Sequence, residues 1–122
     1  MKKIIVAIAG LILSTGVLAE TNAGAGQKWY GPYTIAKVAR YWDGGFRTSI
    51  HVNEVPETSC AVTNDQKKVS YFSDYTNNAF ADSLFSAAAT AQAQHKKVML
   101  LLESKCLDAY GLNLLGVEII SE

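Results

Sequence analysis

The chain has 122 residues, of which 49% are hydrophobic, and it carries eleven basic and eleven acidic side chains. This length is enough for one domain with a modest core. The basic residues are scattered singly or in pairs, which argues against a nucleic-acid-binding face and against a polybasic membrane-binding segment.

The first nineteen residues are predicted to be a secretory signal peptide. Lys2 and Lys3 precede an apolar run from Ile4 to Leu13, and the small residues Val17 and Ala19 stand before a cleavage point. A membrane anchor is the alternative, but the run is shorter than the ~20 residues needed to cross a bilayer. We therefore expect Sec export to the periplasm or beyond, with no membrane span after cleavage. The mature chain then has nine basic and eleven acidic residues, a net charge near −2.

The only two cysteines, Cys60 and Cys106, both lie in the exported part. In an oxidising compartment such a pair is expected to form a disulfide. A metal site or a catalytic thiol is the alternative, but there is no CxxC motif and the two histidines have no ligand spacing. The sequence therefore predicts no metal and no cofactor.

Residues 20–28 are small and polar, and they are predicted to be a flexible leader before a single domain at 29–122. Residues 33–42 are rich in β-formers, and "DGG" at 43–45 indicates a tight turn. In "FRTSIHV", residues 46–52, apolar and polar positions alternate. These features predict a β-hairpin.

A third short strand is predicted at 58–63, "TSCAVT", with Cys60 and Val62 on one face; after a turn, "VSYFS" continues it. Between 76 and 95 the apolar spacing changes to that of one helix face. Its members are Phe80, Leu84, Ala87, Ala88 and Ala91. Thr76 or Asn77 can cap the start of this helix, and the cations His95, Lys96 and Lys97 favour its end there.

"VMLLLES", residues 98–104, is predicted to be a strand buried on both faces, although a continued helix remains open. Residues 112–120 form the last expected strand. A slip in its alternation beside Gly116 indicates a β-bulge. Three strands, one helix and two strands give a mainly β fold, for which we expect a five-stranded Greek-key barrel, the OB-fold. An α+β sandwich of the same order is the alternative.

The stretch "SCAVTNDQKKVSYFSDYTNNAFADSLFSAAATAQAQHKKVMLLLESKC" has a cysteine-bearing strand, a charged turn, a helix, a basic corner and an apolar strand. In this pattern the chain resembles the B subunits of bacterial AB toxins. The resemblance implies an exported OB-fold protein that forms a pentameric ring and binds host-cell glycans. It covers about half of the mature chain and supplies no sugar-binding motif that can be carried over by residue.

Association is also expected on physical grounds, because a strand that is apolar on both faces needs a cover that a small monomer cannot easily provide. The helix carries an alanine-rich face that permits close approach of another subunit. Its alanines are Ala87, Ala88, Ala89, Ala91 and Ala93. The alternative is that these alanines pack onto their own sheet.

No catalytic motif is present, since His51 and His95 stand in no nucleophile, metal or carboxylate-pair pattern. Aromatic side chains beside polar ones are the better lead, because sugar C–H faces pack on rings while hydroxyls take directed hydrogen bonds. The candidate ligand-binding residues are Trp29, Tyr30, Tyr41, Trp42, Asp43 and Arg47. A second aromatic group is Tyr71, Phe72 and Tyr75. Either group can instead serve as core filler.

Two functions follow from these features. The first is an oligomeric, glycan-binding subunit with Trp29 or Trp42 exposed. The second is a monomeric periplasmic inhibitor or immunity-type protein that binds another protein through a loop such as 43–45 or 64–68. An enzyme is not expected.

Overall fold

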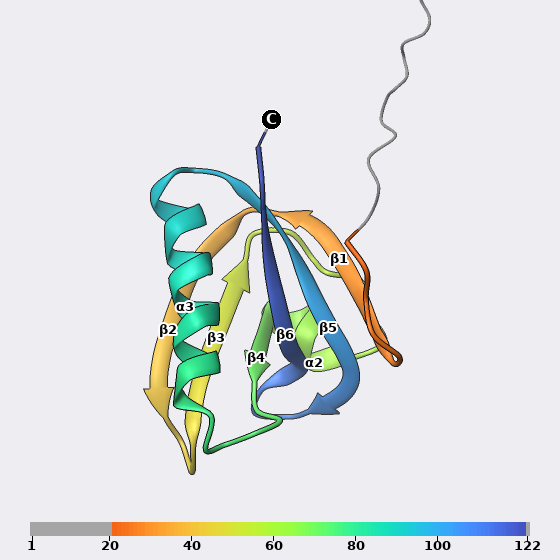
Figure 1. Ribbon diagram of the computed structural model, residues 1–122. Coiled ribbons are helices and arrows are strands. Elements are labelled where there is room, and N and C mark those ends of the chain that lie inside the picture. Colours follow the sequence, from red (N-terminus) through yellow and green to blue (C-terminus); the bar gives the residue numbers. More distant parts are fainter. Residues whose placement is uncertain (1–20, 122) are drawn as a thin grey trace, which may run out of the picture.

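The computed structural model describes residues 21–121, so the predicted signal peptide and Glu20 lie outside the described range. The elements, in chain order, are β1 (Gln27–Tyr33), β2 (Ile35–Trp42), β3 (Phe46–Val52), α2 (Ala61–Gln66), β4 (Lys68–Tyr71), α3 (Asn78–Ala93), β5 (Lys97–Leu107) and β6 (Gly111–Ile120) (Figure 1). The fold is mainly β, with two helices in the described part. None of the helices in residues 21–121 has the length and apolar character needed to cross a membrane.

All six strands belong to one sheet, in the order β1-β5-β6-β4-β3-β2. Every neighbouring pair is antiparallel except β4 and β6, which are parallel. β1 and β2 lie at the two edges of the sheet although only Thr34 separates them in the chain. The sheet therefore has six strands and is not closed, where the sequence led us to expect five strands in a barrel.

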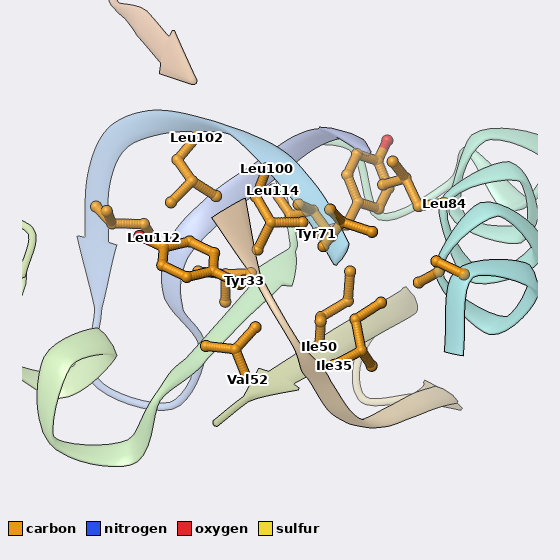
Figure 2. Packing of buried hydrophobic residues seen from close by; sticks show 14 of the residues in the cluster. Tyr33, Ile35, Ile50, Val52, Tyr71, Leu84, Leu100, Leu102, Leu112 and Leu114 are labelled. Carbon is orange, nitrogen blue, oxygen red and sulfur yellow. The ribbon is translucent and has the colours of Figure 1, made fainter. Parts of the chain in front are cut away.

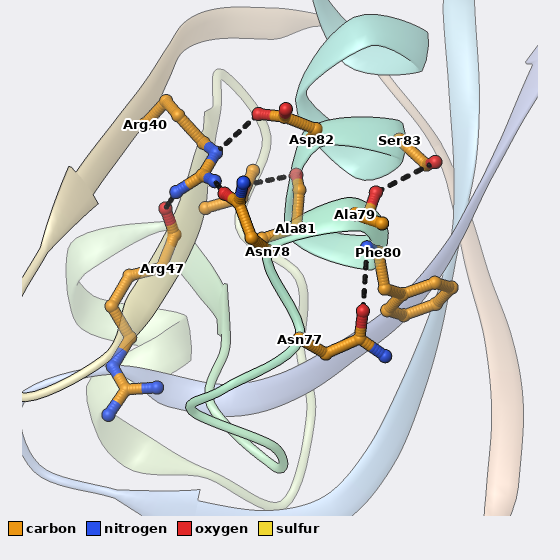
Figure 3. Close-up of polar contacts among 10 residues, drawn as sticks. Arg40, Arg47, Asn77, Asn78, Ala79, Phe80, Ala81, Asp82 and Ser83 are labelled. Carbon is orange, nitrogen blue, oxygen red and sulfur yellow. Dashed lines mark hydrogen bonds and ion pairs between the residues drawn. The ribbon is translucent and has the colours of Figure 1, made fainter.

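The predicted hairpin is confirmed, because β2 and β3 pair from Trp42 opposite Phe46 to Ile35 opposite Val52. The predicted helix is also confirmed as α3, which packs against β2, β3 and β6. Its Asn77 cap accepts a hydrogen bond of 3.0 Å from the backbone N–H of Phe80. In Figure 3, Arg40 of β2 contacts Asp82 and Asn78 and so fixes the first turns of α3 to the sheet.

Residues 97–107 form strand β5 and do not continue the helix, as predicted. Val98, Leu100 and Leu102 point into the core and are fully buried, whereas Met99 and Leu101 on the other face are only half-buried. The expectation of two fully buried faces is therefore wrong for the outer face. The predicted bulge is present, because Leu101 pairs with Gly116 and Leu102 with Leu114, so that Leu115 is the extra residue.

The strand predicted at 58–63 is wrong, because Ala61–Gln66 form α2. Local side-chain bonds favour the helix here: the Asn64 side chain accepts from the Thr58 backbone N–H at 2.7 Å and donates to its carbonyl at 2.8 Å. Lys67 then takes a left-handed conformation that ends the helix. The predicted disulfide is confirmed, with Cys60 and Cys106 joined at 2.06 Å between their sulfur atoms.

The core lies between α3, α2 and the inner face of the curved sheet (Figure 2). Its largest fully buried members on strands come from β3, β4, β5 and β6 and include Ile50, Tyr71, Leu100, Leu112 and Leu114. Ala81, Ala88 and Ala91 of α3 are fully buried against this same sheet. Their burial supports the alternative in which the helical alanines pack within their own chain, while Ala93 is exposed.

Candidate functional site

The six predicted ligand-binding residues fall into two separate groups. Trp29 and Tyr30 lie on β1, which pairs with β5. Tyr41 and Trp42 end β2, Asp43 begins the following turn, and Arg47 is the second residue of β3. The first pair lies near the start of β1 and the others near the end of β2, so they do not form a single site.

Trp29 and Tyr30 serve mainly in packing. The Trp29 ring lies beside Gly116, where an added Cβ would come within 3.3 Å of it. Its Nε1 is enclosed and has no hydrogen-bond partner among the described residues. Tyr30 is half-buried against the core, and the Lys28 ammonium lies 5.4 Å from the centre of its ring. Of the two tryptophans, only Trp42 is largely exposed, at 64%.

Tyr41 is engaged in a chain of hydroxyl groups. Its hydroxyl is hydrogen-bonded to Ser49 Oγ at 2.7 Å, and Ser49 Oγ is bonded to Ser70 Oγ at 2.5 Å. The chain links β2, β3 and β4 on the face that also carries Arg47, which is opposite Tyr41 in the ladder. The Tyr41 hydroxyl therefore helps to hold the strands together beside Arg47 and is not free to bind a ligand.

Three connections meet at the tip of the β2–β3 hairpin: the β2–β3 turn, the β4–α3 loop and the β5–β6 loop. The side chains at this tip are Trp42, Asp43, Arg47, Phe72, Tyr75 and Tyr110, which we call the hairpin-tip site. Trp42 pairs with Phe46 and lies on one face of the hairpin, whereas Arg47 pairs with Tyr41 and lies on the other. The Tyr110 hydroxyl donates to the Asp43 carboxylate at 2.7 Å. The Phe72 and Tyr110 rings stack with their centres 5.7 Å apart.

Gly45 allows the β4–α3 loop to approach the turn. The backbone N–H of Phe46 donates to the Tyr75 carbonyl at 2.9 Å. A Cβ on Gly45 would lie 2.2 Å from Tyr75 Cβ and 3.0 Å from Arg47 Nη1, so only glycine fits here. This packing places the guanidinium of Arg47 between Gly45 and the ring of Tyr110, whose centre is 5.3 Å from Arg47 Cζ.

Asp43 changes the acidity of its tyrosine partner. The hydrogen bond to the Asp43 carboxylate raises the pKa of Tyr110, and partial burial raises it further, although the Arg47 guanidinium opposes the shift. Tyr110 is therefore a hydrogen-bond donor at neutral pH. On one face of the tip a ligand meets the exposed indole of Trp42, and on the other it meets the acceptor at Asp43 and the Tyr110 ring.

Some of these residues were not predicted as part of the site. Phe72 and Tyr75 were noted only as a second aromatic group, and Tyr110 was not singled out. No periodic or motif signal joins Tyr110 to Asp43, because 67 positions separate them in the chain. Only the β5–β6 pairing and the parallel β4–β6 contact bring them together.

A hollow lies at the end of α3. It has a volume of about 320 Å³ and is lined by Thr34, Ile35, Gln92, His95, Lys96 and Lys97. His95, Lys96 and Lys97 were identified in the sequence as a helix-end signal, not as the wall of a cavity. None of the predicted ligand-binding residues lines this hollow.

The hairpin-tip site suits non-covalent recognition of a polar ligand, because ring faces, a carboxylate and a guanidinium converge there. Within residues 21–121, no group of three His, Cys, Asp or Glu side chains could hold a metal ion. Comparison with models of protein families, with curated proteins and with solved structures found no match to this chain.

Proposed function

We propose that the chain is an exported, disulfide-linked binding protein that forms an oligomer and recognises glycans, as the toxin B subunits that it resembles do. The observation that carries this proposal is the hairpin-tip site. There, Trp42 is 64% exposed next to the exposed Asp43, and the Trp42 and Phe46 rings meet edge to face with centres 5.1 Å apart. An indole held in this way offers a flat face to the C–H side of a sugar.

The arrangement of β1 and β2 supports an OB-like fold as part of the proposal. β1 pairs with β5 and β2 pairs with β3, and the chain passes from one to the other through Thr34 alone. If β1 and β2 are counted as one bent strand, five strands remain, with α3 between the third and the fourth. This is the order of an OB-fold, whose loops at one end commonly bind oligosaccharides.

Oligomer formation is supported by the outer face of β5. Met99 and Leu101 there are only half-buried, and so is Ile120 of β6, which lies on the same face opposite Lys97. We expect a second copy of the chain to cover this apolar face. A pentamer is the state that the toxin resemblance implies.

The test uses the mature protein from Glu20 onward, produced by export with its disulfide intact. Light scattering gives its mass, and a glycan array gives its ligands. We expect a ring-sized oligomer and array binding that Trp42→Ala abolishes. Val55→Ala, which also removes an exposed apolar side chain but lies away from the hairpin tip, should leave array binding unchanged. A monomer that binds no glycan at any concentration on the array contradicts the proposal.

One observation favours a second candidate, an inhibitor or immunity-type protein of the periplasm. The turn at Asp43 and Gly44 projects with an exposed Trp42 beside it, as a loop that enters a protein partner would. The other loop considered for this role, 64–68, is not a loop, because it contains the end of α2 and the start of β4. This candidate predicts a monomer that captures one periplasmic protein, with capture lost in Trp42→Ala.

A further inference from the structure

Arg47 is a cation enclosed in the protein without a counter-ion. Only 8% of its surface is exposed, and its Nε and Nη1 have no hydrogen-bond partner among the described residues. Burying a charged group without hydrogen bonds costs several kcal/mol. A guanidinium in this state is therefore expected to have a partner in the working protein.

The residues around Arg47 do not supply that partner. Asp43 is the nearest acidic side chain in the turn, but its carboxylate accepts from the Tyr110 hydroxyl. The single ion pair within residues 21–121 joins Arg40 to Asp82. Figure 3 shows the Arg47 side chain pointing away from that pair. Tyr110 provides a cation–π contact from its ring and a hydroxyl close to the guanidinium, but Nε and Nη1 are left without an acceptor.

We propose that Arg47 binds the carboxylate of an acidic sugar, an inference that rests on the proposed glycan binding and names the ligand class. A planar guanidinium forms its strongest contacts with carboxylate and phosphate oxygens. Asp43 at the same tip favours the singly charged carboxylate, because it repels a doubly charged phosphate more strongly. The sugar ring then lies on the Arg47 face of the hairpin, beside the Tyr110 ring, and Asp43 accepts from its hydroxyls, whereas Trp42 lies on the opposite face.

Entry to Arg47 requires movement of the loops that enclose its guanidinium. Nη1 is enclosed beside Gly45, which Tyr75 covers, and Tyr75 is itself 58% exposed. On the other side lies Tyr110, which is half-buried at the end of the β5–β6 loop. Because Tyr75 Cα and Cβ are the atoms that lie against Gly45, opening a path to the guanidinium requires movement of the β4–α3 loop or of the Tyr110 ring.

The test compares sugars that differ only in charge. Methyl glycosides of glucuronic acid and of N-acetylneuraminic acid are titrated into the mature protein, each as the free acid and as its methyl ester. We expect at least one free acid to bind tenfold or more tightly than its ester and to shift the Nε–H signal of Arg47 in ¹⁵N-resolved NMR spectra. Arg47→Gln should remove the preference for the acid, whereas Arg40→Gln, on the same hairpin, should retain it. Equal binding of acid and ester by the unaltered protein, or a preference that survives Arg47→Gln, overturns the inference.

The NMR readout on the unaltered protein stands even if Arg47→Gln fails to fold, because an unmoved Arg47 Nε–H signal at saturating acid contradicts the inference by itself. The two proposals also fail in different ways. Array binding to neutral glycans that needs Trp42 but not Arg47 leaves the proposed function intact and overturns the acidic-sugar inference. A blank array overturns the proposed function, while the titration of the Arg47 signal still decides whether a carboxylate site exists.

Discussion

The Tyr110 hydroxyl donates a 2.7 Å hydrogen bond to the Asp43 carboxylate and so ties the β5–β6 loop to the β2–β3 turn. Tyr110→Phe removes this bond and keeps the ring that stacks on Phe72. Because the bond is exposed, we expect unfolding in urea to show a loss of only about 0.5–1.5 kcal/mol. Tyr75→Phe, whose hydroxyl makes no hydrogen bond within residues 21–121, should cost less. A larger loss for Tyr75→Phe than for Tyr110→Phe contradicts this role of the bond.

Gly45 is the residue whose replacement should disturb the hairpin-tip site most. In Gly45→Ala the new methyl group meets Tyr75 Cβ at 2.2 Å and Tyr75 Cα at 2.8 Å, so the β4–α3 loop must move. Overpacking of this kind typically destabilises by about 1–3 kcal/mol. We also expect a changed fluorescence spectrum from Trp42, measured in a Trp29→Phe background.

The matched control for this change is Gly44→Asn. Gly44 has a φ of +67° and nothing within 4 Å of an added Cβ, and asparagine tolerates this conformation better than other side chains do. Gly44→Asn should therefore leave the Trp42 spectrum unchanged. If Gly45→Ala and Gly44→Asn change stability and the Trp42 spectrum alike, backbone conformation, and not the contact with Tyr75, explains why this turn needs glycine.

Local sequence patterns were enough to predict a helix or a strand where all residues of the segment favour that same structure. The alternation in 46–52, the spacing from Phe80 to Ala91 and the cations after it each agree with the element formed. The prediction of a strand at 58–63 was wrong because it relied on Thr, Cys and Val, which favour strands on average. The bonds between Thr58 and Asn64, together with the Thr63 hydroxyl that accepts from Leu112 N at 2.8 Å, favour α2 instead. Such tertiary contacts override a weak propensity.

The candidate site was predictable only in part for the same reason. Asp43 and Arg47 are four residues apart and share a hairpin, so their proximity follows from the sequence. Tyr110 reaches them only because β6 returns beside β4. The enclosure of Arg47 by Gly45 and Tyr110 is likewise a property of packing, which residue types alone do not specify.

The disulfide should contribute strongly to stability, because it closes a loop with a sequence separation of 46 residues. On the chain-entropy model, its removal costs up to about 4 kcal/mol. The test is urea unfolding of the double variant Cys60→Ala, Cys106→Ala against the oxidised protein. Urea unfolding of the chemically reduced protein with both cysteines is measured as well. This measurement separates the effect of losing the bridge from the effect of losing the buried Cys60 side chain. Equal midpoints for the oxidised and reduced proteins contradict the expectation.

Tyr33 should make the protein less stable in alkaline solution. Its side chain is 6% exposed, and its hydroxyl donates to the Pro56 carbonyl at 3.2 Å. Burial, aided by Tyr30 and Glu54, raises the pKa of Tyr33 to about 12. Below the unfolded pKa of about 10, Tyr33 is protonated in both states and its contribution is complete. As the pH rises from about 10 to 12, the unfolded chain loses this proton first, so stability falls by up to about 2–3 kcal/mol.

The pH dependence of unfolding in urea between pH 9 and pH 12 measures this effect, and it includes the titration of lysines and other tyrosines. Tyr33→Phe removes the Tyr33 contribution, and the variant should therefore lose stability less steeply over this range than the unaltered protein. Tyr75→Phe, whose hydroxyl makes no hydrogen bond within residues 21–121 and which lies in the β4–α3 loop, provides the comparison for loss of a hydroxyl alone. Because the Pro56 carbonyl loses its donor in Tyr33→Phe, that variant should also start from a lower stability at pH 9. Parallel curves for Tyr33→Phe and the unaltered protein above pH 10 would show that the Tyr33 hydroxyl ionises as readily in the folded state as in the unfolded chain.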